Sequence, residues 1–336
     1  MELLNAFVLL SNFVLVPAIA YGSQLALGAL GVTLIYGILR FSNFAHGDTM
    51  AFGAMVTILF TWLFQSWGVS IHPLPTALLA LPFGILGCIA IVLITDRAVY
   101  RFYREQNAAP VIFLIASLGV MFIMNGLVRF IIGPNDQKFA DGERFIIKAR
   151  TFKKLTGLSE GLSIKVSQGI TVVTAVLVVI ALFWFLNKTR TGKSMRAYSD
   201  NTDLALLSGI NPNRVVMVAW IITAILATVA GTLYGLDKSF KPFVFLQLLL
   251  PIFASAIVGG LGSPVGAIAG GFVIAFSEIM VTYAYKKFIT YLVPEAWAPD
   301  TLVQLLATDY KFAVSFFILL LVLLFRPTGL FAGKSV

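Results

Sequence analysis

The sequence has little charge for its length of 336 residues, and almost no cysteine or histidine. Charged residues make up 12% of the chain, whereas a soluble domain carries roughly 25% because its surface must face water. Hydrophobic residues make up 59%, and the mean hydropathy is +0.93. We therefore predict an integral membrane protein, most of whose outer surface faces the lipid bilayer.

The scarcity of cysteine and histidine excludes disulfide-bonded and metal-binding classes of protein. The single cysteine, Cys88, lies in an apolar run, so disulfides and cysteine metal sites are excluded. The two histidines, His46 and His72, are too few and too far apart for a metal cluster. The net charge of +9 comes from scattered basic residues, so a nucleic-acid partner is not expected.

Long apolar runs predict about eight to ten transmembrane helices, since a helix needs about 20 apolar residues to cross the hydrocarbon core. Backbone groups in lipid must be hydrogen-bonded within a helix or a closed barrel, and alternating strands of barrel length are missing. The predicted fold is an all-α polytopic bundle in one domain, 1–336. The segment 3–16 is either a further short span or a helix at the interface. The predicted spans are residues 15–39, 47–66, 74–95, 109–132, 168–187, 214–236, 246–261, 264–285 and 311–326.

Three hydrophilic segments separate the predicted spans: residues 96–108, 133–167 and 188–213. If successive spans alternate in direction, the first and third segments lie on one side of the membrane and the second lies on the other. Both sides then carry about ten basic residues, so the excess of Lys and Arg that marks cytoplasmic loops does not orient the chain.

The segment 188–213 combines a short helical pattern with a definite stop. Gly209 is typical of a helix end, and Pro212 follows it. A helix too short to span lies at the membrane surface, so we predict a docking element; the alternative is a solvated charged face. The apolar stripe of this helix consists of Ala197, Leu204, Ala205 and Leu207.

Glycine is concentrated near the C-terminal end, in VGGLGSPVGAIAGG, residues 258–271. One interpretation is tight helix packing with a turn at residues 262–264, because small residues spaced four apart let membrane helices approach closely. The other is a pair of broken helices that line a pathway, where irregular backbone faces a cavity. Both interpretations involve the same residues, which are Gly259, Gly260, Gly262, Pro264, Gly266 and Gly270.

Four motifs carry a resemblance to a known family: NFAHGD at 43–48, GKSMRAYSDNTDLALLSGI at 192–210, VGGLGSPVGAIAGG at 258–271 and LLFRPTGLF at 323–331. From about Tyr21 to Phe331 the chain resembles the permease subunits of bacterial branched-chain amino acid ABC importers. Related permeases serve other amino acids, urea or short amides.

The resemblance implies an ATP-driven, binding-protein-dependent importer in the bacterial inner membrane. Its partners would be two cytosolic ABC ATPase subunits, a second related permease or a second copy of this chain, and a periplasmic substrate-binding protein. ATP is bound by the partner subunits, so this chain is expected to be neither an enzyme nor a cofactor protein.

The resemblance further implies that residues 188–213 form the cytoplasmic coupling segment, which contacts the ATPase. This orientation makes residues 133–167 a periplasmic loop, and it places residues 40–48 near the cytoplasmic ends of two helices. The residues that match the family's coupling pattern are Gly192, Arg196, Ala197, Asp200, Ala205, Gly209 and Ile210.

Residues 40–48 hold five polar side chains between two apolar runs. Ser42 or Asn43 could cap a helix or turn, and Gly47 could permit a tight reversal. The alternative is a polar constriction for a zwitterion, because an unpaired charge in hydrocarbon is costly. A proton switch at His46 is the weakest of the three interpretations.

Glu278 is the one acid well inside a span. It either pairs with a basic group on a neighbouring helix or meets the ammonium group of the substrate. Arg129, near the end of another span, is expected to snorkel to the interface. The candidate residues of the translocation path are Thr33, Tyr36, Asn43, His46, Asp48 and Glu278.

Two alternatives were weighed against the importer. The tripeptide Gly-Lys-Ser occurs at 192–194 and 333–335, but a phosphate-binding loop needs a glycine where Asn187 and Thr328 stand. A stand-alone secondary transporter would need a chain of buried carboxylates for ion coupling, and the sequence shows none.

Overall fold

Nine helices among the described residues are long and apolar enough to cross a membrane. The computed structural model describes residues 1–293, 299 and 301–331; the second Gly-Lys-Ser tripeptide lies outside them. The spanning helices are α2 (Val16–Leu39), α3 (His46–Ser66), α4 (Ala77–Thr95), α6 (Pro110–Ile132), α8 (Val166–Lys188), α11 (Pro212–Lys238), α12 (Pro242–Gly259), α13 (Pro264–Thr282) and α15 (Lys311–Phe325).

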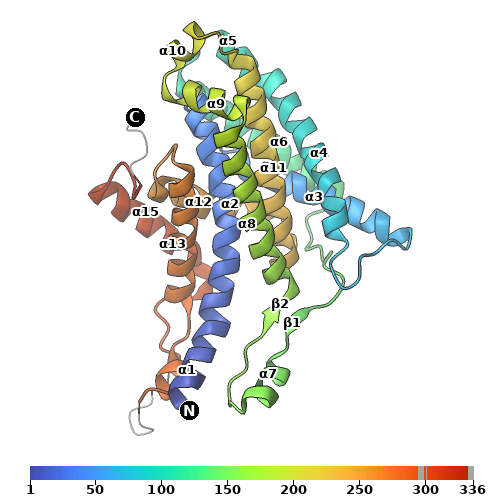
Figure 1. Cartoon of the computed structure of the whole chain (residues 1–336), viewed down its shortest axis with the longest axis vertical. Coiled ribbons are helices and arrows are strands. Elements are labelled where there is room, and N and C mark those ends of the chain that lie inside the picture. The colour runs from blue at the N-terminus through green and yellow to red at the C-terminus, as the bar shows by residue number, and fades with distance from the viewer. Residues whose placement is uncertain (294–298, 300, 332–336) are drawn as a thin grey trace.

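The remaining elements are short and lie at the two ends of the bundle (Figure 1). They are α1 (Glu2–Leu10), α5 (Arg101–Glu105), α7 (Ala149–Thr156), α9 (Arg190–Asp200), α10 (Thr202–Leu207), α14 (Lys286–Thr290), β1 (Phe145–Ile147) and β2 (Ile164–Lys165). The all-α polytopic fold predicted from the apolar runs is confirmed for the described residues.

Proline marks the start of four spanning helices. Pro110, Pro212, Pro242 and Pro264 each occupy the first position of their helix. The first N–H of a helix has no partner within the helix, and the proline ring fixes a helical φ, so the residue begins a helix that it would interrupt elsewhere.

The N-terminal segment is part of the first spanning helix. A π-helical turn, Ser11–Leu15, joins α1 to α2, and Glu2–Leu39 is one helix of 38 residues. The prediction of a separate span or interfacial helix at 3–16 is therefore wrong. Pro17 lies in the first turn of α2, directly after the widened turn, where its missing N–H is tolerated. At 1.5 Å per residue this helix is about 57 Å long, nearly twice the thickness of the ~30 Å hydrocarbon core.

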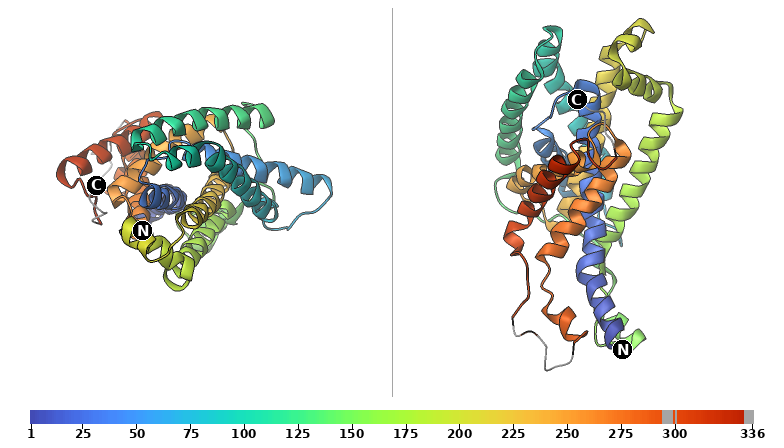
Figure 2. Two further views of the ribbon diagram at one scale, coloured as in Figure 1. Left: turned by 90° about the horizontal axis from the view of Figure 1, so that it is seen from above. Right: turned by 90° about the vertical axis from the view of Figure 1, so that its left-hand side faces the viewer.

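Helix α2 is the centre of the bundle. It packs against α8, α11, α12 and α13, which surround it when the molecule is seen from above (Figure 2). Most of its side chains, from Ala18 to Ile38, are buried. Helix α11 extends the core toward α3 and α4.

The hydrophilic segments lie at opposite ends of the bundle, as the alternation of spans predicts. Figure 1 shows α5, α9 and α10 at one end, and α7, β1 and β2 at the other. The segment 133–167, expected as a loop, contains helix α7 and a two-stranded antiparallel sheet of β1 and β2.

Asp141 attaches this segment to the bundle. Its carboxylate accepts hydrogen bonds from the Thr76 backbone N–H at 2.7 Å, the Thr76 hydroxyl at 2.5 Å and the Gln65 amide at 3.0 Å. Partial burial acts to raise the pKa of Asp141, but the hydrogen bonds from Thr76 and Gln65 outweigh it and lower the pKa.

Candidate functional site

The predicted coupling segment forms two short helices in place of the single one expected. The break lies at Asn201, whose side-chain oxygen accepts a hydrogen bond from the Leu204 N–H at 3.0 Å and so begins α10. Gly209 ends α10 with a φ of +78°, as predicted for a helix stop. Asn211 then caps α11.

The residues predicted for ATPase coupling divide between two environments. Gly192 and Ala205 are buried, and a Cβ on Gly192 would lie 2.2 Å from the carbonyl oxygen of Phe185 on α8. Their small size therefore allows close packing within the chain. The exposed members of the set are Arg196, Ala197, Asp200 and Gly209, and Ile210 is half-buried.

Helix α10 lies at one extreme of the molecule (Figure 1), and its leucine side chains are exposed. Leu204 is 61% exposed and Leu207 is 84% exposed, and Leu206 lies beside them. We call these three residues the α10 leucine tip. Exposed leucines that border charged residues are typical of a surface that another protein covers.

A hydrogen bond joins α9 to the end of α2. The guanidinium of Arg40 donates to the backbone carbonyl of Ser199 at 2.7 Å. Arg40 itself ends α2 in the left-handed conformation, with a φ of 57°. This bond connects α9 directly to the end of α2.

The connection between α2 and α3 turns back into the bundle. His46 begins α3, and its imidazole lies against Gly31, where a Cβ would be 2.5 Å from the His46 Cε1 atom. Gly31 is nine residues before Arg40, which corresponds to about 13 Å along the helix axis. The expectation that residues 40–48 lie at the cytoplasmic ends of two helices is therefore wrong for the second helix, which begins deep in the bundle.

Asn43 forms the turn before α3. Its side-chain oxygen accepts hydrogen bonds from the Ala45 N–H at 3.1 Å and from the Tyr100 hydroxyl at 3.3 Å. The capping interpretation is confirmed for Asn43 in the form of a turn, since Ala45 is the residue that precedes α3. Gly47 lies inside α3, and a Cβ there would be 2.5 Å from the carbonyl oxygen of Phe245. Gly47 therefore allows α12 to approach and does not form the tight reversal that was expected.

Asp48 on α3 belongs to a chain of polar groups that continues on α6 and ends against an aromatic ring on α12. Its side chain is almost fully buried and accepts a hydrogen bond from the Asn125 amide at 2.6 Å. The Asn125 oxygen in turn accepts from the guanidinium of Arg129, which lies 3.6 Å from the ring centroid of Phe243 on α12. Arg129 thus turns inward, and the prediction that it snorkels to the interface is wrong.

Glu278 connects α13 to α15. Its carboxylate accepts a hydrogen bond from the hydroxyl of Ser315 and is fully buried. Lys311, also on α15, interacts with it electrostatically, and the Lys311 ammonium lies 5.5 Å from the ring of Tyr21. The hydrogen-bond partner of Glu278 is therefore Ser315, and no ion pair joins Glu278 to Lys311 among the described residues, so the expected pairing with a basic group stays a prediction. The contact of this carboxylate with substrate stays a prediction.

The residues predicted for the translocation path do not form one cluster, because those with recorded contacts have different neighbours. Asn43 lies beside Tyr100, Asp48 beside Asn125, and Glu278 beside Ser315. Tyr36 is half-buried on α2. Their part in a translocation path stays a prediction.

The glycine-rich segment forms a tight antiparallel pair of helices, α12 and α13. A Cβ on Gly259 would lie 2.0 Å from the Gly266 carbonyl oxygen, and one on Gly270 would lie 2.0 Å from the Ser255 carbonyl oxygen. Gly260 and Gly262 have φ values of 109° and 84° in the turn, and Pro264 starts α13. The packing interpretation is confirmed.

The last motif of the sequence pairs with this turn. The backbone N–H of Leu330 donates to the Val258 carbonyl at 2.8 Å, and that of Phe331 donates to the Gly259 carbonyl at 3.1 Å. The LLFRPTGLF motif thus satisfies carbonyls at the end of α12 that have no partner within that helix.

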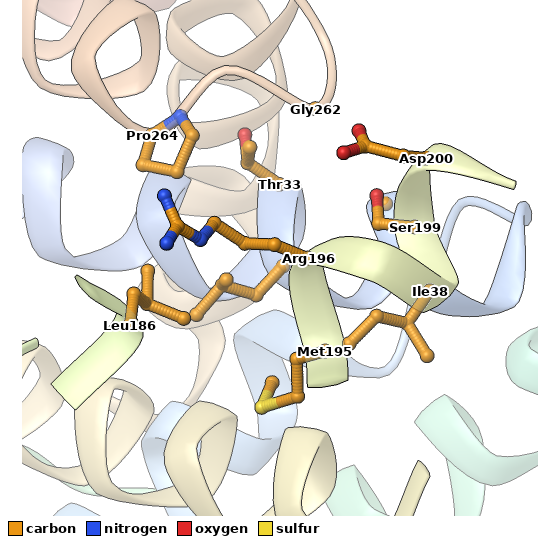
Figure 3. A pocket seen from close by; sticks show the side chains of 11 residues that line it. Thr33, Ile38, Leu186, Met195, Arg196, Ser199, Asp200, Gly262 and Pro264 are labelled. Carbon is orange, nitrogen blue, oxygen red and sulfur yellow. The ribbon is translucent and has the colours of Figure 1, made fainter. Parts of the chain in front are cut away.

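A crevice of about 170 Å³ lies between α2, α8, α9 and the turn that joins α12 to α13 (Figure 3). It brings together Thr33, predicted for the path, with Arg196 and Asp200, predicted for ATPase coupling. This proximity could not be predicted from the sequence, because about 160 residues separate the two groups and no pattern relates them. The crevice is lined by Thr33, Leu34, Gly37, Ile38, Leu186, Met195, Arg196, Ser199, Asp200, Gly262 and Pro264.

A larger cavity of about 460 Å³ lies at the opposite end, between the segment 138–144 and the outer ends of α8 and α11. Asp237 in its wall is almost fully buried, and Lys165 and Lys238 lie 3.6 Å and 3.8 Å from its carboxylate. Ser167 donates a hydrogen bond to the same carboxylate at 3.3 Å. These charges hold the start of α8 against the end of α11. Within the described residues, no group of three or more His, Cys, Asp or Glu could hold a metal ion.

Comparisons with known proteins show the family of the chain. The family described as branched-chain amino acid transport system, permease component, matches residues 14–323. The chain is similar to the high-affinity branched-chain amino acid transport system permease protein LivH of Escherichia coli, with 29% identity over 95% of this chain and 94% of LivH. It is also similar to the corresponding protein BraD of Pseudomonas aeruginosa, with 30% identity over 96% of each chain. Among solved structures, PsaBC from Streptococcus pneumoniae in complex with Fab covers 97% of this chain and matches with 14% identity and a TM-score of 0.44.

Proposed function

The chain belongs to the family of branched-chain amino acid transport permeases, and we propose that it imports branched-chain amino acids across the bacterial inner membrane. It is a multi-pass transmembrane permease subunit of an ABC importer. The names of LivH and BraD both specify branched-chain amino acids, which favours this substrate class over urea or short amides.

The proposed assembly has two cytosolic ATPases, a second permease or a second copy of this chain, and a periplasmic binding protein. The α10 leucine tip is the main support for the proposed ATPase contact, because it is apolar, exposed and at one extreme of the molecule. This assignment makes the end that holds α9 and α10 cytoplasmic and the end that holds α7 periplasmic.

The proposed mechanism is alternating access. When the ATPases close on ATP, they displace α9 and α10. The hydrogen bond from Arg40 to the Ser199 carbonyl passes this displacement to α2. Because α2 packs against α8, α11, α12 and α13, its movement rearranges the helices around the path.

Affinity purification from detergent tests the ATPase contact. We expect an ATPase subunit to co-purify with the wild-type chain and to be lost from the double variant Leu204→Glu, Leu207→Glu. Leu155→Glu is the matched control, because Leu155 is 83% exposed at the opposite end and should retain the ATPase.

Uptake of radiolabelled leucine by cells that lack other leucine transporters tests the substrate class. The substrate assignment is contradicted if the wild-type chain imports no leucine, and the ATPase contact is contradicted if the leucine-tip variant imports leucine as fast as the wild type. It is also contradicted if no ATPase co-purifies with the wild-type chain while uptake continues, because a stand-alone transporter would then explain the uptake.

A further inference from the structure

The crevice between α2 and α9 has a polar side and an apolar side. Leu34, Ile38, Leu186 and Met195 line one part of its wall. The polar part contains Thr33, Arg196, Ser199 and Asp200, which lie at the opposite side in Figure 3. A pocket with aliphatic walls and a few convergent polar groups is the usual form of a small-molecule site.

Thr33 is the buried polar group that points to a ligand. It is 1% exposed, and its hydroxyl oxygen has no hydrogen-bond partner among the described residues. Other buried threonines of the bundle bond to their own helix: Thr57 donates to the Gly53 carbonyl at 2.9 Å, and Thr61 donates to the Thr57 carbonyl at 2.7 Å. A buried hydroxyl without a hydrogen-bond partner is unfavourable. A ligand that forms a hydrogen bond with Thr33 removes this cost, which makes its free energy of binding more favourable.

Arg196 directs its guanidinium toward Thr33 and Pro264, into the crevice, in Figure 3. It comes from α9, whereas the exposed leucines that fit an ATPase contact lie on α10. A guanidinium offers a planar pair of donors that matches a carboxylate. Arg196 is therefore placed to bind a small molecule in the crevice.

We propose that this crevice is a cytoplasmic-side binding site for a free amino acid with an aliphatic side chain. Arg196 and Thr33 bind its carboxylate, and Ile38, Leu186 and Met195 contact its side chain. Asp200, on the same rim, supplies the opposite charge that the ammonium group needs. The side of the membrane and the substrate class in this assignment rest on the proposed function.

Equilibrium binding of radiolabelled leucine to the purified full-length permease in lipid nanodiscs tests the site. We expect Thr33→Val and Arg196→Gln each to weaken binding about tenfold or more, since each removes a hydrogen bond to a charged group. Thr95→Val and Arg97→Gln are matched controls, because they make the same changes at the same end outside the crevice and should bind leucine as the wild type does.

Competition identifies which part of the ligand is recognised. Valine should displace leucine, whereas isoamylamine, which has the aliphatic chain and the amine but no carboxylate, should not. The proposal is overturned if isoamylamine competes as well as leucine, or if both crevice variants bind leucine with wild-type affinity. Thr33→Val is nearly isosteric, so it keeps the test valid even if Arg196→Gln fails to fold.

Uptake measured in parallel separates this inference from the proposed function. If the wild-type chain imports leucine normally but binds no leucine in nanodiscs, the crevice assignment is overturned and the proposed function is not. If the wild-type chain imports no branched-chain amino acid, but the crevice variants still lose binding of an aliphatic amino acid, the site stands and the proposed function fails.

Discussion

At the scale of single residues, the bundle stabilises its buried polar groups across helices. Asp48 on α3, Asn125 and Arg129 on α6, and Phe243 on α12 form one continuous set of contacts. Asn125 gives the Asp48 carboxylate a donor and the Arg129 guanidinium an acceptor, and leaving such groups unpaired in hydrocarbon would cost several kcal/mol. The middle residue, Asn125, bonds to both charged neighbours, so the set depends most strongly on it.

Asn125→Leu should destabilise the fold by on the order of 3 kcal/mol, because it leaves the Asp48 carboxylate buried without its hydrogen-bond donor. The measurement is the apparent melting temperature of the detergent-solubilised permease, followed by fluorescence-detected size exclusion. Asn187→Leu makes the same change at an exposed position at the end of α8 and should alter stability by no more than about 0.5 kcal/mol. Equal melting temperatures for the two variants would show that the contacts of Asn125 contribute nothing to stability.

Gly259→Ala should reduce the yield of folded protein severely. The added Cβ would lie 2.0 Å from the carbonyl oxygen of Gly266, and neither backbone can move without separating α12 from α13. Gly126→Ala is the control, since nothing lies within 4 Å of a Cβ at that position on α6. Monodisperse protein from both variants in equal amounts would contradict the close packing.

The sequence indicated which buried residues are unusual, but it did not indicate their partners. Glu278 and Asp48 are conspicuous as acids within apolar runs. Their partners, Ser315 and Asn125, are 37 and 77 residues away, and ordinary polar side chains at that separation carry no signal. Arg129 was expected to reach outward because it lies near the end of a span, and the sequence does not show that Asn125, on the same helix, turns toward Asp48 in the assembled bundle.

At the scale of elements, α9 packs against α8, α11 and the end of α2. Its contact with α2 includes the hydrogen bond from Arg40 to the Ser199 carbonyl, and Met195 on α9 is buried. In the proposed importer, this contact passes the movement of the ATPase on to the helices of the bundle.

Arg40→Ala should uncouple ATP hydrolysis from transport, because the ATPase still binds α10 but α9 no longer pulls on α2. We expect the assembled transporter in proteoliposomes to keep most of its ATPase activity while leucine uptake falls about fivefold or more, the loss that one charged hydrogen bond of 1 to 2 kcal/mol implies. Arg97→Ala removes another exposed arginine at the same end and should leave both rates unchanged. Parallel loss of both activities in Arg40→Ala would show that Arg40 serves assembly instead.

The contact between α14 and the loop after α7 should depend on pH. Partial burial acts to raise the pKa of Glu160, but hydrogen bonds from Lys287 and Tyr291 outweigh it and hold the pKa below its ordinary value of 4.5. A carboxyl with a lowered pKa in the folded state contributes stability above its ordinary pKa, and this contribution is lost as the pH falls through the folded-state pKa. The contact should therefore be intact at neutral pH and weaken as the pH falls below about 4.5.

Hydrogen exchange of residues 286–291, corrected for the intrinsic effect of pH, measures this change. Protection in the wild type should decrease between pH 6 and about pH 3. Glu160→Gln should show low protection at both values. A wild type that is equally protected throughout would exclude Glu160 as the group responsible.

Hydropathy predicted the positions of the spanning helices to within a few residues, because about 20 apolar residues in a row have few other solutions in a membrane. Hydropathy did not predict the features that depend on contacts between helices, because it describes only the local composition of the chain. The segment 3–16 was expected as a separate span or interfacial helix, but a π-helical turn at Ser11–Leu15 joins it to α2. The depth of His46 depends on space beside Gly31, which hydropathy does not report.

At the scale of the whole molecule, the chain has two distinct ends. One carries α5, α9 and α10, and the other carries α7 and the small sheet (Figure 1). The proposed function makes the first end cytoplasmic, although the distribution of basic residues does not by itself decide the orientation.

Cysteine labelling decides the orientation. The native thiol of Cys88 is fully buried in α4, so it should not react with a membrane-impermeant maleimide. Lys153→Cys on α7 should be labelled in spheroplasts with intact inner membranes, and Leu207→Cys on α10 should be labelled only after that membrane is permeabilised. The reverse pattern would invert the proposed topology.

The buried start of α3 determines when during synthesis this segment can complete its contacts. The ribosome delivers helices to the translocon from the N-terminus, so residues 40–48 enter the bilayer before their later neighbours exist. Asp48 bonds to Asn125 on α6, and Gly47 packs on Phe245 of α12, so this segment is not fully covered until α12 has been made. A nascent chain of three or four helices therefore has no complete site for it. The packing around the start of α3 can therefore be completed only after α12 has been synthesised, so the last step in folding this segment follows the synthesis of most of the chain.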